Sequence, residues 1–259
     1  MLDVKSLEKT YGDGPSAFTA LRGVTFSVGR GDFVSVVGPS GAGKTTLLKC
    51  LTGLIPVSDG VVELLGSPVT APPKEMAIVF QDYSRSLMPW LSVQQNVAFP
   101  LQSSGITKDA ISERVNRAIT AVGLSGKDKL KPWQLSGGMQ QRVAIARALA
   151  YEPEILIMDE PFASVDAQTR FDLEDLVLRL RREFSMTLVL VTHDIDEAVY
   201  VSDRIIVLGG SPTTVTGSLT VEFDGERNQE TTRNSPHFAK LRTALYHGLK
   251  TGEPIEPVA

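Results

Sequence analysis

The sequence contains the stretch Gly38-Pro39-Ser40-Gly41-Ala42-Gly43-Lys44-Thr45, which fits the pattern G-x-x-x-x-G-K-[ST]. Residues 33–37 before it have the composition of a buried strand, and leucines at 47, 48 and 51 favour a helix after it. Glycines at such a turn let backbone N–H groups converge on phosphate oxygens at the positive end of a helix. The stretch therefore predicts a phosphate-binding loop, in preference to a glycine-rich turn that only caps a helix.

The end of this loop carries side chains that suit a triphosphate. Lys44 adds a positive charge for the outer phosphates, and the hydroxyl of Thr45 is placed to bind Mg²⁺. Cys50, in the same predicted helix, is interpreted as a small core side chain rather than a redox group. The residues expected to bind the nucleotide here are Gly38, Pro39, Ser40, Gly41, Ala42, Gly43, Lys44, Thr45 and Thr46.

Short apolar runs alternate with helical patterns along the chain, which predicts an α/β fold with a covered, parallel sheet. Apolar residues recur at helical spacing over residues 168–184, and again over residues 236–249 behind a Ser-Pro start. From about Trp90 to Leu149 only helices are favoured, which predicts an inserted helical subdomain. The predicted strands are residues 25–28, 33–37, 60–65, 76–80, 155–158, 188–191 and 204–208.

The composition is that of a globular protein, with 42% hydrophobic and 22% charged residues among 259. A net charge of −4 argues against a surface that coats nucleic acid. Cys50 is the only cysteine, which excludes a disulfide framework and a four-cysteine zinc site. The longest apolar run, residues 76–80, is far shorter than the roughly 20 residues that span a bilayer. Because residues 1–5 show no export signal, we expect the protein to stay where it is made.

A carboxylate pair follows the apolar run 155–158. Asp159 and Glu160 would lie at the carboxyl edge of the sheet, where open α/β folds bind ligands. Asp159 is the natural partner of Mg²⁺, and Glu160 can orient or deprotonate a water in line with the γ-phosphate. The alternative is an exposed acidic turn before Pro161, which the upstream loop makes less favourable.

A second helix start carries the segment Leu135-Ser136-Gly137-Gly138-Met139-Gln140-Gln141-Arg142. The N–H groups of Ser136, Gly137 and Gly138 form a second predicted anion site. It has no lysine of its own, so by itself it could hold a phosphate but not hydrolyse it. Taken alone, the segment favours a capped helix with Ser136 as the cap, but the upstream phosphate-binding loop reverses this preference in favour of the anion site.

Together these motifs resemble the ATP-binding subunit of an ATP-binding cassette (ABC) transporter. The resemblance covers about Leu2 to Gly209, with a Walker A motif at 38–45, a signature at 135–140, a Walker B motif at 155–159 and the catalytic glutamate at Glu160. It implies a P-loop NTPase (RecA-like) core with a mostly parallel sheet, an N-terminal antiparallel β part and an inserted α-helical subdomain at about 88–150. Residues 1–209 would form the ATPase domain, and residues 210–259 a C-terminal β/helix extension.

The resemblance also implies that two subunits bind two ATP molecules head to tail between them. Ser136, Gly137, Gly138 and Gln140 would then contact the nucleotide held by the other subunit. Gln81 resembles the Q-loop glutamine, which reaches Mg²⁺ and the attacking water. His193 resembles the switch histidine that hydrogen-bonds the γ-phosphate. The implied Mg²⁺ ligands are Thr45, Gln81 and Asp159.

Two further positions fit the family less closely. Tyr11 resembles the aromatic residue that stacks on adenine, although Phe18 is a nearby alternative. Asp166 resembles the D-loop aspartate, but Ala163-Ser164-Val165-Asp166 departs from the usual small-Ala-Leu-Asp string. His237 and His247 are assigned no chemistry.

The segments 86–97, 159–170 and 235–241 resemble importers of nitrate, sulfonate and taurine. This implies a peripheral ATPase on the cytoplasmic side of the inner membrane, bound to integral-membrane permease subunits and to a second, identical ATPase subunit. An extracytoplasmic substrate-binding protein would act indirectly, and no nucleic acid would be bound. Two alternatives remain: a P-loop small-molecule kinase with a lid formed by Arg179, Arg181 and Arg182, or an ABC ATPase of DNA repair or translation.

Overall fold

The computed structural model describes residues 1–163, 165–252 and 255, and only the backbone of residues 83 and 84. The chain divides into two compact units. The first unit comprises residues 1–74 and 187–259, and the second comprises residues 75–186. The first unit thus joins the N-terminal part of the chain to the whole C-terminal part, including the extension expected from residue 210.

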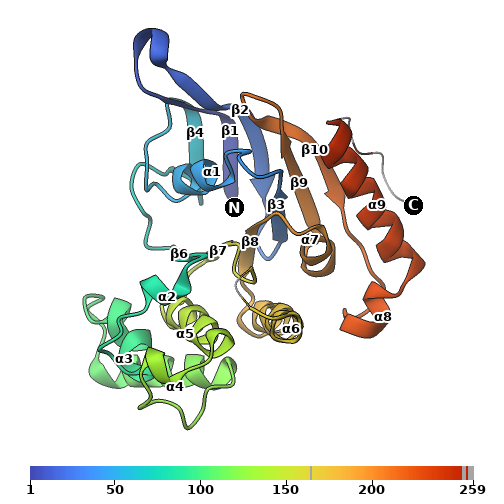
Figure 1. The fold of residues 1–259 in the computed structure, drawn as a ribbon. Coiled ribbons are helices and arrows are strands. Elements are labelled where there is room, and N and C mark those ends of the chain that lie inside the picture. The colour runs from blue at the N-terminus through green and yellow to red at the C-terminus, as the bar shows by residue number, and fades with distance from the viewer. Residues whose placement is uncertain (164, 253–254, 256–259) are drawn as a thin grey trace. The chain divides into compact units, whose positions relative to one another are not determined.

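An antiparallel sheet with strand order β2-β1-β4-β5 forms one part of the first unit (Figure 1). Leu2 and Val4 are buried and lie opposite Val28 and Phe26. The sheet confirms the expected N-terminal antiparallel part. Its strands are β1 (Leu2–Tyr11), β2 (Phe18–Val28), β4 (Asp59–Leu64) and β5 (Ser67–Pro68), and a 3-10 helix spans Gly14–Ser16.

Strand β1 was not expected from the sequence, because an irregularity interrupts its alternation of apolar and polar residues. Ser6 has a φ of +49°, and the register toward β2 shifts between Val4 and Leu7. Such a shift moves the side chains beyond it to the opposite face. Leu7 is therefore buried, although a regular strand starting from Leu2 would place Ser6 on that face.

The parallel sheet of the first unit has the order β10-β9-β3-β8. Strand β3 pairs in parallel with β8 and β9, whereas β10 pairs antiparallel with β9. Every residue of β3 and of β8 is buried, as expected for strands covered on both faces. The strands are β3 (Phe33–Val37), β8 (Thr187–Thr192), β9 (Arg204–Gly209) and β10 (Thr214–Thr220).

The α-helices that the structure describes in the first unit are α1 (Lys44–Leu51), α7 (Ile195–Val201), α8 (Gln229–Arg233) and α9 (Pro236–Thr251). The expected C-terminal helix is confirmed as α9, which packs against α7 and β9 (Figure 1). Ser235 caps it by accepting a hydrogen bond from the N–H of Phe238 at 3.1 Å. Phe238, Leu241 and Leu245 form its buried stripe. Cys50 is 1% exposed, which confirms its assignment to the core.

The second unit contains the parallel strand pair β6 (Met76–Val79) and β7 (Ile155–Asp159). Residues 90–149, all of which the structure describes, contain no strand, as the sequence predicts. Helix α5 contacts α2, α3, α4 and α6 and is therefore the centre of the helical packing. The helices are α2 (Tyr83–Ser86), α3 (Val93–Ala98), α4 (Lys108–Ala121), α5 (Gly137–Ala150) and α6 (Ala167–Phe184), with 3-10 helices at Phe99–Leu101 and Pro132–Gln134.

Arginine side chains bind backbone carbonyls at the end of α4. Arg142 donates to the carbonyl of Val122 at 2.9 Å, and Arg179 donates to that of Ala121 at 2.9 Å. These bonds satisfy acceptors that a helix end leaves without a partner.

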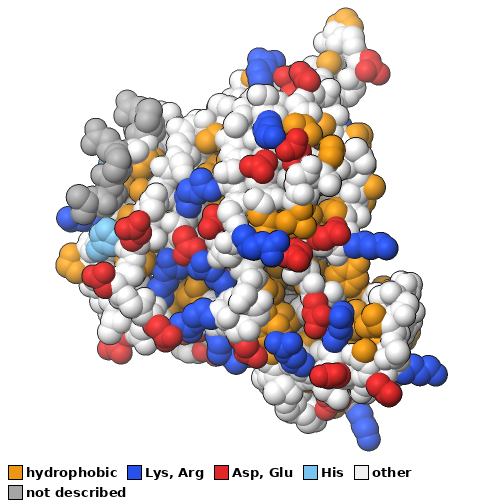
Figure 2. All heavy atoms as spheres, turned by 180° about the vertical axis from the view of Figure 1, so that it is seen from behind, with side chains coloured by type: hydrophobic (Ala, Val, Ile, Leu, Met, Phe, Trp, Pro, Cys, Tyr) orange, Lys and Arg blue, Asp and Glu red, His pale blue; other side chains and the backbone are white. Residues whose placement is uncertain are grey.

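The face in Figure 2 shows acidic and basic side chains interspersed. Among the described residues, the structure contains no helix that is both long and apolar enough to cross a membrane.

Candidate nucleotide-binding site

The phosphate-binding loop runs from the end of β3 at Val37 to the start of α1 at Lys44. Gly41 and Gly43 have φ values of +82° and +67°, in the left-handed region that other residues rarely adopt. At Gly38 the requirement is space, because an added Cβ would lie 3.0 Å from the Leu208 carbonyl oxygen. The loop therefore needs glycine at two positions for conformation and at a third for close packing on β9.

Helix α1 opens with backbone N–H donors that no N-cap side chain binds, and with a positive charge. Its N-cap is Gly43, which has no side chain to bind those donors, and the first turn carries Lys44, Thr45 and Thr46. Lys44 is 8% exposed, and its Nζ donates to the carbonyl oxygens of Gly38 at 2.8 Å and Pro39 at 3.1 Å. An ammonium group held beside the loop at the start of a helix suits a polyphosphate.

A cavity of about 300 Å³ adjoins the loop within the first unit. Tyr11 and Phe18 both line it, so both remain candidates for the contact with a base. The Tyr11 hydroxyl lies 3.3 Å from that of Thr46, and the Lys9 Nζ lies 5.2 Å from the centre of the Tyr11 ring. Sequence reasoning missed one wall of the cavity, residues 210–213. The lining is completed by Thr19, Ala20, Pro39, Ser40, Gly41, Ala42, Gly43 and Thr46.

His193 lies in the turn between β8 and α7 and is exposed. The turn is held by buried polar groups: the Thr192 hydroxyl donates to Glu197 Oε2 at 2.8 Å and accepts from the Asp194 N–H at 3.0 Å. Asp194 in turn caps α7, which includes Glu197. Sequence reasoning missed Glu197, although its burial to 3% exposure requires a partner for its carboxylate.

The second unit contains the carboxylate pair at the end of β7. Asp159 is 8% exposed, and Glu160 has a φ of +42°. A non-glycine residue in this conformation is strained, and such strain tends to concentrate at functional sites. Gln81, which follows β6, donates from Nε2 to Glu160 Oε2 at 3.1 Å. The structure thus brings together two of the residues predicted to handle the attacking water.

The signature segment begins α5. Ser136 is its N-cap and accepts from the Met139 N–H at 3.3 Å, so this residue has the capping role that the sequence allowed. Gln140 donates from Nε2 to the carbonyl oxygens of Pro132 at 3.0 Å and Leu135 at 3.2 Å. Its side chain therefore stabilises the turn that presents Ser136, and its contact with a nucleotide stays a prediction.

Asp166 is the N-cap of α6. Its Oδ1 accepts from the Thr169 N–H at 3.0 Å, and its Oδ2 accepts from the Thr169 hydroxyl at 2.7 Å. These two bonds hold the pKa of the Asp166 carboxyl below its ordinary value. Ser164, part of the predicted D-loop, lies outside the described residues.

The predicted site residues thus form two groups. Tyr11, the phosphate-binding loop and His193 belong to the first unit, whereas Gln81, Asp159, Glu160, the signature and Asp166 belong to the second. Within the described residues, no group of three or more His, Cys, Asp or Glu side chains is arranged to hold a metal ion. The predicted Mg²⁺ ligands Thr45, Gln81 and Asp159 come from both units, and their convergence stays a prediction.

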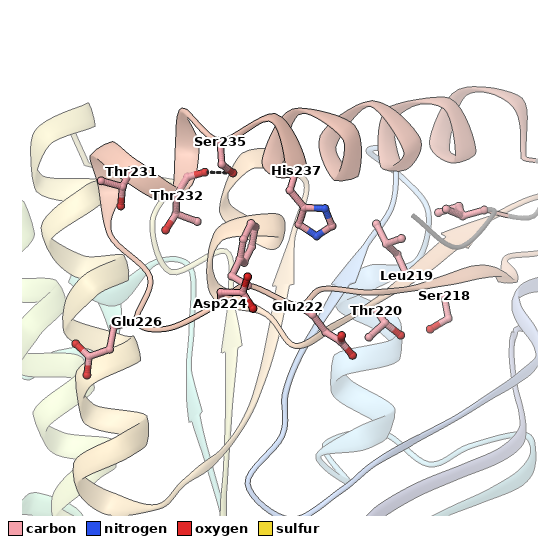
Figure 3. A pocket seen from close by; sticks show the side chains of 12 residues that line it. Ser218, Leu219, Thr220, Glu222, Asp224, Glu226, Thr231, Thr232, Ser235 and His237 are labelled. Atoms are coloured by element: carbon pink, nitrogen blue, oxygen red, sulfur yellow. Dashed lines mark hydrogen bonds between the residues drawn. The ribbon is translucent and has the colours of Figure 1, made fainter. Parts of the chain in front are cut away.

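A larger cavity of about 1000 Å³ lies in the first unit beside β10, α8 and α9 (Figure 3). Glu222, Asp224 and Glu226 give it an acidic lining. His237 also faces it, and its ring packs edge-on against Phe223 with centroids 5.5 Å apart. His237 therefore has a packing partner, which the sequence did not indicate.

Comparison with known proteins identifies the family. The family profile described as "ABC transporter" matches residues 21–163, more than half of the chain. The chain belongs to the ABC transporter family. Relatives of this ABC protein include the aliphatic sulfonates import ATP-binding protein SsuB of Bacillus licheniformis, with 40% identity over 97% of this chain and 95% of the relative. The taurine import ATP-binding protein TauB of Escherichia coli strain K12 is 39% identical over 93% of this chain and 94% of its own.

A solved structure supports the same family. It is the dimeric ATP-binding cassette MJ0796 in a post-hydrolysis state with ADP and phosphate. It is similar with a TM-score of 0.74 and 32% identity, over 86% of this ABC chain and all of the other. The predicted family and fold class are therefore confirmed. Family membership excludes the kinase alternative, and the Arg179 guanidinium assigned to a kinase lid instead binds the Ala121 carbonyl.

Proposed function

We propose that this chain is the ATP-hydrolysing subunit that energises an ABC importer, and that it works as a pair of identical subunits. The observation that carries the proposal is the phosphate-binding loop, with the Lys44 ammonium held inside it at a helix start. Similarity over almost the full length to subunits named for sulfonate and taurine import supports the importer role over one in DNA repair or translation.

Nucleotide binding would use the groups of the first unit. The N–H groups of the loop and of the first turn of α1 would hold the phosphates, and Lys44 would leave the Gly38 and Pro39 carbonyls to reach the outer ones. Tyr11 or Phe18 would pack against the base in the adjoining cavity. Mg²⁺ held by Thr45, Gln81 and Asp159 would neutralise charge on the phosphates.

Hydrolysis would need Glu160 to take a proton from a water whose oxygen bonds to the γ-phosphorus, while the bond from that phosphorus to the β–γ bridging oxygen breaks and ADP leaves. The bond from Gln81 to Glu160 orients this carboxylate, and Gln81 would help to hold the same water. His193, on its braced turn, would donate a hydrogen bond to the γ-phosphate. For these groups to act together, the carboxylate edge of the second unit must reach the phosphate-binding loop of the first.

The signature would complete the site of the partner subunit. Ser136 is the N-cap of α5 and Gly138 lies in its first turn, so N–H groups at this helix start would suit a γ-phosphate held across the dimer. Asp166 would lie at the same contact between subunits.

The proposed domain division is an ATPase domain over residues 1–209, with its helical insert at about 88–150, and a C-terminal extension over residues 210–259.

The permease would dock on the second unit, where several large apolar side chains are exposed. Trp90 is 67% exposed, Trp133 70% and Phe99 45%, and such side chains often mark interaction sites. The subunit would then lie on the cytoplasmic side of the inner membrane. The imported substrate would be a small anion or zwitterion such as an alkanesulfonate, taurine or nitrate, delivered by an extracytoplasmic binding protein.

The test is to recover this chain with its membrane partner and to measure transport. Membranes are solubilised gently, the proteins that copurify with the chain are identified, and the complex is reconstituted in vesicles. ATP-dependent uptake of an alkanesulfonate, taurine and nitrate is then compared with uptake by a complex that carries Glu160→Gln. We expect an integral-membrane protein to copurify with the chain. We also expect the parent complex to take up substrate and the Glu160→Gln complex not to do so. A chain that hydrolyses ATP at full rate as a dilute monomer would contradict the shared-site proposal.

A further inference from the structure

Thr169, in the first turn of α6, makes two bonds to the side chain of Asp166. Its N–H donates to Asp166 Oδ1 at 3.0 Å, which is the ordinary capping bond of a helix start. Its hydroxyl donates to Asp166 Oδ2 at 2.7 Å, which the cap does not require. Both carboxylate oxygens are therefore fixed by one residue, and this sets the direction in which Asp166 points.

The other branch of the Thr169 side chain points to the signature. A Cβ added at Gly138 would overlap the Thr169 methyl carbon, whereas Cβ and Oγ1 of Thr169 would lie at ordinary distances of 3.6 and 3.8 Å. Gly138 is helical and has no positive φ, so the backbone itself would accept alanine there. The absence of a side chain at Gly138 therefore makes room for the Thr169 methyl group.

These two contacts are mechanically linked, because threonine is stiff about its first side-chain torsion. The hydroxyl bond to Asp166 selects one rotamer, and that rotamer places the methyl group in the space that a Cβ of Gly138 would need. The methyl group cannot turn away unless the hydroxyl leaves the carboxylate. A displacement of the start of α5 toward Thr169 would therefore disturb the hydroxyl bond to Asp166.

We propose that Thr169 is a positioning residue that links the signature segment at Gly138 to the Asp166 carboxylate. The inference rests on the proposed function, in which both groups face the partner subunit. With this link, each subunit presents its signature and its aspartate in one arrangement, so the dimer forms without first having to order them. A plain capping role for Asp166 needs only the N–H of Thr169 and involves neither the methyl group nor Gly138.

The first experiment compares Thr169→Val and Thr169→Ser, with Gln168→Ala as the control on the same helical turn. Valine keeps the shape but removes the hydroxyl, whereas serine keeps the hydroxyl and removes the methyl group. ATP-dependent dimerisation is measured by sedimentation in a Glu160→Gln background, and nucleotide affinity is measured on dilute monomer.

Thr169→Val should weaken dimerisation by about tenfold, the scale of one hydrogen bond to a charged group. Its monomer affinity for ATP should stay that of the parent protein, and its Tm should fall only slightly, because the N–H cap remains and the lost bond is exposed. Thr169→Ser, which lacks the methyl half of the link, should also dimerise more weakly than the parent, whereas the control should dimerise like the parent. Equal dimerisation by the valine variant and the parent would overturn the proposal.

The second experiment tests the steric half of the link on the monomer. Gly138→Ala should push the Thr169 methyl away, break the hydroxyl bond and raise the pKa of the Asp166 carboxyl, measured by NMR titration. Combining Gly138→Ala with Thr169→Ser should restore the low pKa, because serine has no methyl group to collide with. An Asp166 pKa that Gly138→Ala leaves unchanged would refute the link. If the Glu160→Gln parent never dimerises with ATP, the proposed function fails, whereas this monomer test still decides the link.

Discussion

Replacement of Lys44 is expected to weaken nucleotide binding by about ten- to hundredfold. The ammonium is 8% exposed and bonds to the carbonyls of Gly38 and Pro39, so it is already inside the loop that would hold the phosphates. A hydrogen bond to a charged group contributes about 1.5–3 kcal/mol, and each 1.4 kcal/mol is about tenfold in Kd. Removing the charge should therefore raise the Kd without altering the path of the loop.

Two substitutions separate the charge of Lys44 from its packing. Lys44→Ala removes the whole side chain, whereas Lys44→Met keeps an apolar stem of similar length. Both leave the buried carbonyl of Gly38 without its donor, and this should lower the free energy of unfolding by about 1–3 kcal/mol. Lys49→Ala is the matched control, since Lys49 is exposed on the last turn of the same helix.

The assay is a titration of dilute monomer with a fluorescent ATP analogue, together with thermal unfolding of each variant. Both Lys44 variants should bind at least about tenfold more weakly than the parent while still unfolding cooperatively. Lys49→Ala should bind like the parent. A Lys44→Met variant that is folded and binds with the parental Kd would refute the reasoning about the loop.

Three further predictions follow from the site and the core. Glu160→Gln should keep ATP binding, reduce turnover by about 100-fold or more and trap an ATP-bound dimer in sedimentation, and unchanged turnover would remove Glu160 from its role as base. Ser136→Arg should leave ATP binding by monomer unchanged but abolish dimer-dependent turnover, and full turnover in the variant would contradict the shared site. Burial raises the pKa of the Cys50 thiol to about 11. Iodoacetamide at pH 8 should therefore label the folded protein far more slowly than the urea-unfolded protein. Equal labelling rates for the two would contradict this prediction.

Local patterns predicted most of the regular elements. The run 33–37 became β3 with the predicted bounds, and residues 168–184 became α6 from Ala167 to Phe184. These segments are decided by their own periodicity and burial, because each is either apolar on both faces or carries one continuous stripe. Strand β1 was missed for the opposite reason: its shift of register near Ser6 depends on pairing with β2, which the sequence of residues 2–11 does not show.

The residues of the candidate site also fall into those that a local pattern could predict and those that it could not. Sequence alone was enough to predict the phosphate-binding loop, the carboxylate pair and the signature, because each needs particular residue types at fixed spacing within one short segment. Only the tertiary structure showed that Glu197 braces the turn of His193, that residues 210–213 line the cavity beside Tyr11, and that Thr169 fills the space left by Gly138. These contacts join segments far apart in the chain or depend on the rotamer of one side chain. Such relations arise only when the packed elements meet, so no local pattern could have revealed them.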